Sequence, residues 1–178
     1  DALGTRILDQ LVAEGVDASP PAFALHRPRV GLYQSWVPSI DEGWTRFVFE
    51  QQVDVEYQTL HDADVRAGGL RSRFDAIVLP DQAAKQLREG HAPGALPPEY
   101  VGGLGADGVR ALRAFVQEGG TLIALDSATA LAIAEFGLLV KDALADLGPV
   151  ATEDDEDASG ASFYSPGAIL ETRVEGGR

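Results

Sequence analysis

Ser127 is the residue of this sequence whose surroundings come closest to those of a nucleophile. It follows a predicted strand, Thr121–Leu125, and opens a helical stretch, Ser127–Glu135. A serine at such a turn can be activated by a neighbouring base, for which Asp126, Asp81 or a histidine are the candidates. The residues around it lack the Gly-x-Ser-x-Gly pattern of a tight nucleophile turn. The alternative interpretation is that Asp126 or Ser127 caps the helix that follows.

Polar side chains also follow two other predicted strands. These are Gln34, Ser35 and Trp36 after Val30–Tyr33, and Asp81 and Gln82 after Phe74–Leu79. Ligands of α/β proteins bind at the carboxyl ends of the strands, so these groups and Asp126 predict a small-molecule site there. The competing interpretation of Pro80-Asp81 is an ordinary turn.

Metal and thiol chemistry have little support. The chain has no cysteine, which excludes disulfides, thiolate metal sites and cysteine nucleophiles. None of the three histidines, His26, His61 and His91, begins the His-x-x-Glu pair of a zinc peptidase. His61 and Asp64 have the spacing of a variant of that pair with Asp in place of Glu, but a lone His and Asp at this spacing are usually polar residues exposed to solvent. We therefore expect no metal and no cofactor.

The charge of the chain limits its partners. The formal net charge is -14 at pH 7, and such a surface repels both nucleic acid and anionic lipid. No apolar run approaches the roughly 20 residues that span a bilayer. No secretory signal is visible, and the start at Asp1 suggests a processed protein or a fragment, so these residues leave the compartment unknown.

The elements that must position these groups follow from the spacing of apolar residues. The predicted strands are Val30–Tyr33, Val53–Leu60, Phe74–Leu79 and Thr121–Leu125, with weaker candidates at Leu138–Val140 and Ile169–Val174. The predicted helices are Ala2–Glu14, one capped by Ser39 that runs to about Gln51, Asp62–Ala67, one between Asp107 and Gly119, Ser127–Glu135 and Lys141–Leu147. Strands and helices that alternate in this way predict a parallel sheet with helices on both faces, a flavodoxin-like α/β fold.

The two tryptophans are predicted to differ in environment. Trp44 shares a helical face with Phe47 and Val48, which predicts a place in the core. Trp36 lies in a loop that contains Pro38, and we expect it to be exposed and to form a wall of a pocket or a docking face.

A long loop is predicted over Gly90–Gly108, which holds three prolines and six glycines. Its glycines do not predict a phosphate-binding loop, because no Lys-Ser/Thr follows them and no strand directly precedes them.

Two regions are expected outside the main domain or at its surface. Residues 1–29 read as an N-terminal helix and a proline-rich linker, and 30–178 as one domain whose end at Arg178 looks truncated. Glu153–Asp157 is a run of five acidic residues, typical of a solvated loop.

Three segments together resemble a known family. They are Leu32–Arg46, Phe74–Gln82 and Gly119–Ser127. In order and content they resemble the C-terminal region of large bacterial zinc-carboxypeptidase-like proteins, where a domain similar to class I glutamine amidotransferases follows the peptidase. The resemblance covers roughly Arg29 to Leu170, and its most specific piece is the first segment.

The resemblance implies that Asp126 and Ser127 stand at the nucleophile turn, where active amidotransferases carry a cysteine that a histidine deprotonates. It therefore implies a non-catalytic accessory domain with a structural, positioning or regulatory role, whose partner is an upstream peptidase domain of the same parent chain. Peptide binding or oligomerisation fits the same class. The resemblance further suggests a periplasmic or secreted parent protein.

Two rival functions stay open. One is a cryptic serine hydrolase that uses Ser127, and the other is a small-molecule sensor that binds at the strand ends through Asp81, Gln82 and Asp126.

Overall fold

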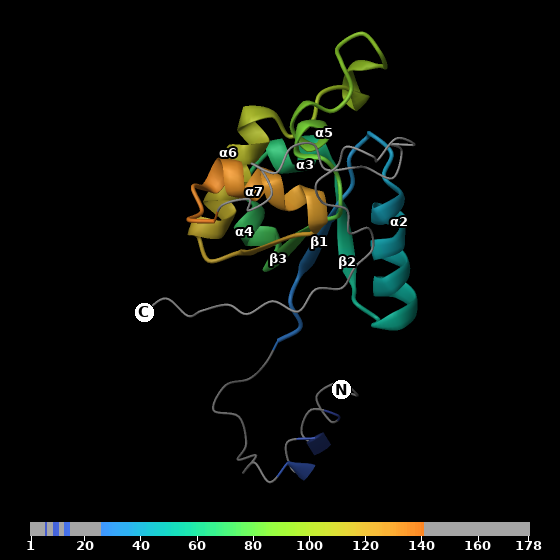
Figure 1. Ribbon diagram of the computed structural model, residues 1–178, viewed down its shortest axis with the longest axis vertical. Helices are drawn as coiled ribbons and strands as arrows, with labels where there is room; N and C mark the ends of the chain where they lie inside the picture. Colours follow the sequence, from blue (N-terminus) through green and yellow to red (C-terminus); the bar gives the residue numbers. More distant parts are fainter. Residues whose placement is uncertain (1–5, 7–8, 11–12, 15–25, 141–178) are drawn as a thin grey trace, which may run out of the picture. The chain divides into compact units, whose positions relative to one another are not determined.

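The computed structural model describes residues 26–140 and, nearer the N-terminus, residues 6, 9–10 and 13–14 (Figure 1). Several predicted features lie wholly or largely outside these residues, namely Ala2–Glu14, Lys141–Leu147, Glu153–Asp157 and Ile169–Val174. The chain up to Leu131 forms one compact unit, and residues from Ala132 onward belong to a second. The domain boundary placed between residues 29 and 30 stays a prediction.

A four-stranded parallel sheet with the strand order β2-β1-β3-β4 organises the first unit, which confirms the predicted α/β class. The strands are β1 (Val30–Tyr33), β2 (Tyr57–Leu60), β3 (Ala76–Leu79) and β4 (Thr121–Ala124). The helices are α2 (Ile40–Phe47), α3 (Asp62–Arg66), α4 (Leu70–Arg73), α5 (Ala84–Glu89), α6 (Gly105–Gln117) and α7 (Thr129–Phe136), the last of which crosses into the second unit. Shorter helical turns are the π-helix η1 (Val48–Gln52) and the 3-10 turns η2 (Pro98–Tyr100) and η3 (Asp126–Ala128).

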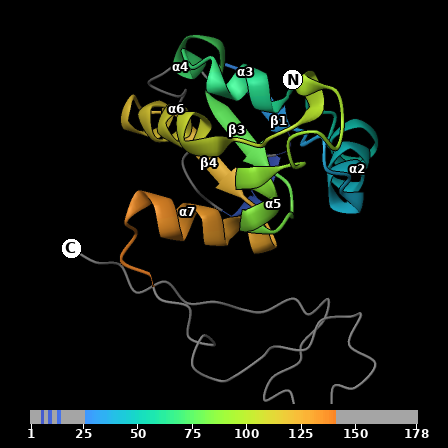
Figure 2. The ribbon, with the colours of Figure 1, turned by 90° about the horizontal axis from the view of Figure 1, so that it is seen from above.

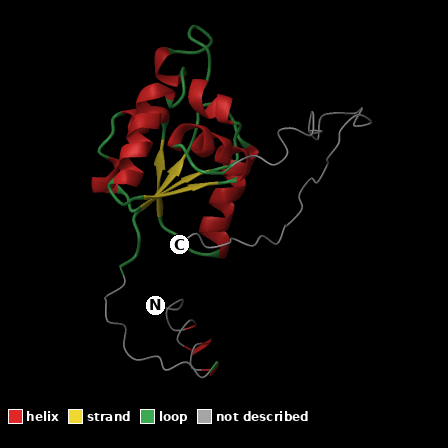
Figure 3. Ribbon diagram, turned by 60° about the vertical axis from the view of Figure 1, so that its left-hand side comes forward, coloured by secondary structure: helices red, strands yellow, loops and turns green. Residues whose placement is uncertain are grey.

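The two central strands, β1 and β3, carry apolar side chains on both faces, and both faces are covered by helices. Leu32 in β1 and Ile77 and Leu79 in β3 are fully buried. The helix α2 lies on one side of the strands and α6 on the other (Figure 2), and helices cover both faces of the sheet (Figure 3). On the α2 side, Val30, Leu32 and Val78 form a cluster against Phe49, Val55 and Tyr57. Burial on both faces is what a continuous apolar run in a parallel strand indicates.

The orientation of α2 corrects the predicted place of Trp44. Its side chain is 61% exposed, so the prediction of a core tryptophan is wrong. The side of α2 that meets the sheet is polar: Glu42 is largely buried and pairs with Arg46. Arg46 also donates to the Tyr57 hydroxyl and the Thr59 Oγ1, each at 3.0 Å. These bonds orient the polar side inward and leave the apolar side outward.

Other elements differ from expectation at their ends. Leu138–Val140 forms no strand, and α6 begins at Gly105 rather than after Asp107. Strand β2 begins at Tyr57 rather than Val53, because the π-helix carries the chain to Gln52 before it turns.

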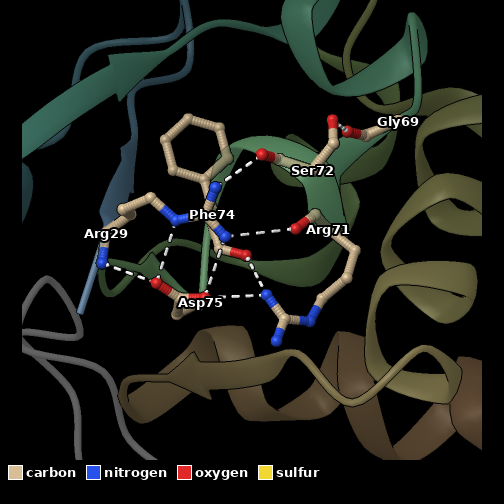
Figure 4. A network of polar contacts seen from close by, with 6 residues as sticks. All are labelled: Arg29, Gly69, Arg71, Ser72, Phe74 and Asp75. Carbon is tan, nitrogen blue, oxygen red and sulfur yellow. Dashed lines mark hydrogen bonds and ion pairs between the residues drawn. The ribbon is translucent and has the colours of Figure 1, made fainter. Parts of the chain in front are cut away.

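At the amino end of the sheet, an ion cluster joins the starts of β1 and β3 (Figure 4). The Asp75 carboxylate accepts from the Arg29 backbone N–H at 2.9 Å and from the Arg29 Nε at 3.0 Å. It also accepts from Arg71 at 2.7 Å. The hydrogen bonds from Arg29, with those from Arg71, hold the pKa of the Asp75 carboxyl well below its usual range.

This cluster predicts an acid-sensitive contribution to stability. An aspartate whose folded-state pKa lies below its unfolded value of about 3.9 stabilises fully above that value, and the contribution is lost as the pH falls through the folded-state pKa. We expect Asp75→Asn to lower the urea midpoint near pH 7. The wild-type midpoint should then approach that of the variant as the pH falls to about 2. Urea titrations followed by circular dichroism test this, and parallel pH profiles would contradict it.

Candidate functional site

A pocket of about 340 Å³ opens at the carboxyl ends of β1 and β3. The chain leaves β1 toward β2 on one side and returns to β3 on the other, so these two strands form the topological switch point of the sheet. Open parallel sheets bind ligands in this crevice. Four of the residues predicted at the strand ends line the pocket, namely Gln34, Ser35, Trp36 and Gln82.

The loop after β1 is held rigidly at the pocket. Ser39 caps α2 by accepting from the Glu42 N–H at 3.2 Å, and its hydroxyl donates to the Asp81 carbonyl at 3.0 Å. This confirms the predicted Ser39 cap, and the Glu42 side chain pairs with Arg46. Gln82, which is almost fully buried, donates to the Val37 carbonyl at 3.1 Å. These bonds tie the ends of β1 and β3 together.

Gln34 places one polar group beside Arg46. Its side-chain oxygen accepts from the guanidinium at 3.4 Å, and its backbone carbonyl contacts the His61 Nδ1 at 2.9 Å. The Gln34 side chain therefore links the pocket to the inward polar side of α2, and its backbone carbonyl links it to the end of β2.

Trp36 is half-buried beneath an aromatic stack rather than exposed. Its ring lies parallel to His61 with centroids 4.0 Å apart, and Tyr100 meets it edge-on at 4.7 Å. The His91 Nε2 contacts the Trp36 carbonyl at 3.1 Å. The end of β2 and the loop between α5 and α6 thus both converge on Trp36. Sequence reasoning missed this role for all three partners, although His61 directly follows a predicted strand and the strand-end rule points to it.

Beneath this stack lies a buried acid. Asp62 is 1% exposed and accepts from the Tyr33 hydroxyl through Oδ1. Among the described residues, its Oδ2 has no hydrogen-bond partner. Burial raises the pKa of the Asp62 carboxyl, and the Tyr33 bond opposes that rise. Burial also raises the pKa of the Tyr33 hydroxyl, so it stays a neutral donor.

The turn after β4 contains one of the two described non-glycine residues with a positive φ. Asp126 adopts a left-handed φ of 42°, which is uncommon outside glycine. The backbone N–H of the next residue, Ser127, donates to the Asp81 Oδ1 at 3.0 Å. In hydrolases of this architecture, the N–H after the nucleophile helps to bind the oxyanion. In this protein a carboxylate oxygen of Asp81 occupies that donor.

Ser127 has no contact with an imidazole. All three histidines lie in the described part of the chain, and the side chains of His61 and His91 interact with Gln34, Trp36 and Asp62. In the described part of the chain, the hydrogen bonds at Asp126 and Ser127 involve the Asp126 carbonyl and the Ser127 N–H rather than a capping side chain. The backbone N–H of Ser127 is instead bound by the side chain of Asp81, which lies in the loop after β3.

The candidate His/Asp pair is a structural feature of α3. Asp64 accepts from the His61 backbone N–H at 2.9 Å and so completes a capping box at the start of the helix. Within the described residues, no three histidine, aspartate or glutamate side chains form a group that could hold a metal ion. No helix in this part of the chain combines the length and apolar character needed to cross a membrane.

The predicted site residues therefore fall into two places. Gln34, Ser35, Trp36 and Gln82 share the pocket, whereas Asp81, Asp126 and Ser127 meet at the turn after β4. No protein-family model, no curated protein and no solved structure matches this chain.

Proposed function

We propose that this chain is a non-catalytic, amidotransferase-like accessory domain that acts by binding rather than by chemistry. The observation that carries the proposal is the hydrogen bond from the Ser127 N–H to the Asp81 carboxylate. An oxyanion hole works through preorganised donors that await developing negative charge. Asp81 occupies this donor and its negative charge repels a second anion, so a nucleophile at position 126 loses its main electrostatic support. For a nucleophile at Ser127 the following N–H is that of Ala128, and it is already bound to the Leu125 carbonyl at 3.0 Å.

Two further features favour this proposal over a cryptic serine hydrolase. The turn places an exposed aspartate, Asp126, at the residue with positive φ, and no described base contacts the hydroxyl of Ser127. A serine hydroxyl is a weak nucleophile unless a neighbouring base activates it. The resemblance to the domain that follows a zinc-carboxypeptidase-like peptidase supplies the expected partner, an upstream peptidase domain of the parent chain.

A serine-reactive fluorophosphonate tests the absence of chemistry. We expect no adduct on Ser127 after incubation near pH 8, and identical labelling of the wild type and Ser127→Ala by mass spectrometry. An active serine hydrolase in the same tube shows that the reagent is competent. An adduct on Ser127 that the alanine variant lacks would overturn the proposal.

A second function, small-molecule binding, is favoured by the pocket itself. Its volume of about 340 Å³ lies at the lower end of ligand pockets, which run from roughly 300 to 1,000 Å³. Gln34 and Gln82 offer amide groups in it, and Trp36 offers a ring face. In a Trp44→Phe variant, Trp36 is the single tryptophan, so its fluorescence reports on the pocket. A metabolite set that leaves both this fluorescence and the melting temperature unchanged would remove this function.

A further inference from the structure

We infer that the outward side of α2 is a docking surface for an amphipathic, basic helix of a partner polypeptide. This inference rests on the proposed function, because it names the surface through which a domain without chemistry would act. The surface consists of Ile40, Trp44, Phe47 and Val48, which we call the α2 stripe. Their side chains are 80%, 61%, 45% and 43% exposed.

The α2 stripe is continuous. Its members recur at i, i+4, i+7 and i+8, the spacing of one helical face that packs against a neighbour. The rings of Trp44 and Phe47 meet edge-on with centroids 5.8 Å apart. Single exposed apolar residues are ordinary, but a contiguous apolar face on one helix marks an interaction site. The helix spans about 12 Å at 1.5 Å per residue, a length that suits one partner helix packed alongside.

The stripe cannot turn inward without breaking buried ion pairing. The opposite side of α2 carries Glu42, which is 9% exposed, and its partner Arg46. Arg46 reaches across to Tyr57 and Thr59 of β2. A rotation that buried Trp44 would pull Glu42 and Arg46 away from the sheet and leave their partners unpaired, which is costly. The polar network thus fixes the apolar side outward.

The charges around the stripe define the chemistry of its partner. Asp41 on α2 and Asp54 on the turn after η1 are both exposed, whereas the Glu50 carboxylate accepts from the Tyr57 hydroxyl of β2. Arg46 is the single basic residue between Trp36 and Leu60, and it is already paired with Glu42. A partner helix that flanks its apolar side with Lys or Arg would therefore gain complementary contacts.

The same charges argue against two other occupants. A second copy of the chain would bring its own carboxylates and a net charge of -14 to the same surface. An anionic bilayer would be repelled in the same way.

The fluorescence of Trp44 can be used to measure peptide binding at the α2 stripe. In a Trp36→Phe variant it is the single tryptophan of the chain, so its emission reports on the stripe alone. The probes are two synthetic helical peptides without aromatic residues, one built from leucine and lysine, the other with glutamate at every lysine position. We expect the leucine–lysine peptide to move the Trp44 emission to shorter wavelength with a saturable dependence, and the leucine–glutamate peptide to leave it unchanged.

Matched variants distinguish binding at the α2 stripe from non-specific binding to exposed apolar side chains. Phe47→Ser and Ile40→Ser, each made in the Trp36→Phe background, are expected to weaken peptide binding roughly tenfold or more, as truncation of a central anchor does. Val116→Ser removes a similarly exposed apolar side chain from α6 and should leave binding unchanged. Far-ultraviolet circular dichroism checks that each variant is folded.

Four outcomes would overturn the inference. The first two are no emission shift with the basic peptide and an equal shift with the acidic peptide. The third is a shift that grows with protein concentration in the absence of peptide, which would indicate that a second copy binds. The fourth is a shift with phosphatidylcholine vesicles, which would indicate that a bilayer binds. None of these touches Ser127. Labelling of Ser127 by a phosphonate would instead remove the proposed function and leave peptide binding at α2 as it is.

Discussion

Replacing Gly90 with alanine is expected to destabilise the protein by about 3 kcal/mol or more. Gly90 has φ 58° and ψ -148°, a conformation open essentially to glycine alone. A Cβ at this position would lie 1.8 Å from the Gly102 carbonyl oxygen, so the backbone itself must move. Urea unfolding followed by circular dichroism measures the loss.

The effect should reach the pocket, because Gly90 lies where the two ends of the loop that carries Tyr100 come together, against Gly102. We call this close approach the neck of the loop. The neighbouring His91 forms an isolated bridge with Gly102 and contacts the Trp36 carbonyl. Opening the neck would withdraw Tyr100 from Trp36, and the Trp36 emission of a Trp44→Phe background should move to longer wavelength. Gly94→Ala is the matched control: Gly94 also has a positive φ, 84°, but nothing lies within 4 Å of its added Cβ. It should cost only about 1 kcal/mol. Equal losses for the two variants would contradict the steric argument.

The fold could be predicted from the apolar strands, and the pocket residues that follow β1 and β3 could be predicted from their place at the strand ends. The runs at β1 and β3 are apolar at nearly every residue, which is typical of strands buried on both faces. Once those two strands are neighbours in a parallel sheet, Gln34, Trp36 and Gln82 must approach one another. Asp81 and Ser127 meet for the same reason, because β3 and β4 are adjacent.

The orientation of α2 could not be predicted from its pattern. Amphipathic spacing shows that a helix has an apolar side but does not say which side meets the sheet. Arg46 decides the matter through partners on β2, at Tyr57 and Thr59, which are 11 and 13 residues away in the chain. A local pattern contains no information about such partners.

The aromatic stack on Trp36 escaped prediction for a similar reason. His91 and Tyr100 belong to a loop rich in proline and glycine, and their contacts with Trp36 span more than 50 residues of sequence. A Cβ at Gly90 or at Gly103 would clash with backbone atoms, which explains why the two ends of this loop need glycine. These glycines allow the backbone to close the neck of the loop, a role that differs from the cradling of phosphate.

Tyr33→Phe is expected to destabilise the protein by about 2 kcal/mol near pH 7, with a smaller loss in acid. The change removes the donor that Asp62 accepts through Oδ1, while Oδ2 already lacks a partner among the described residues. Burial raises the pKa of the Asp62 carboxyl, and loss of the Tyr33 bond removes an influence that lowers it. The folded-state pKa of Asp62 in the variant should therefore rise further.

The sign of the pH dependence follows from that rise. A carboxyl whose folded-state pKa lies above the unfolded value of about 3.9 binds its proton more tightly when folded. Its stabilising effect is present below that value and is lost as the pH rises through the folded-state pKa. The gap in unfolding free energy between wild type and Tyr33→Phe should thus widen from about pH 4 to about pH 7 in urea titrations. Adding Asp62→Asn to both proteins removes the titrating group, so the gap should then be independent of pH. A gap that keeps its pH dependence in the Asp62→Asn background would show that a group other than Asp62 is responsible.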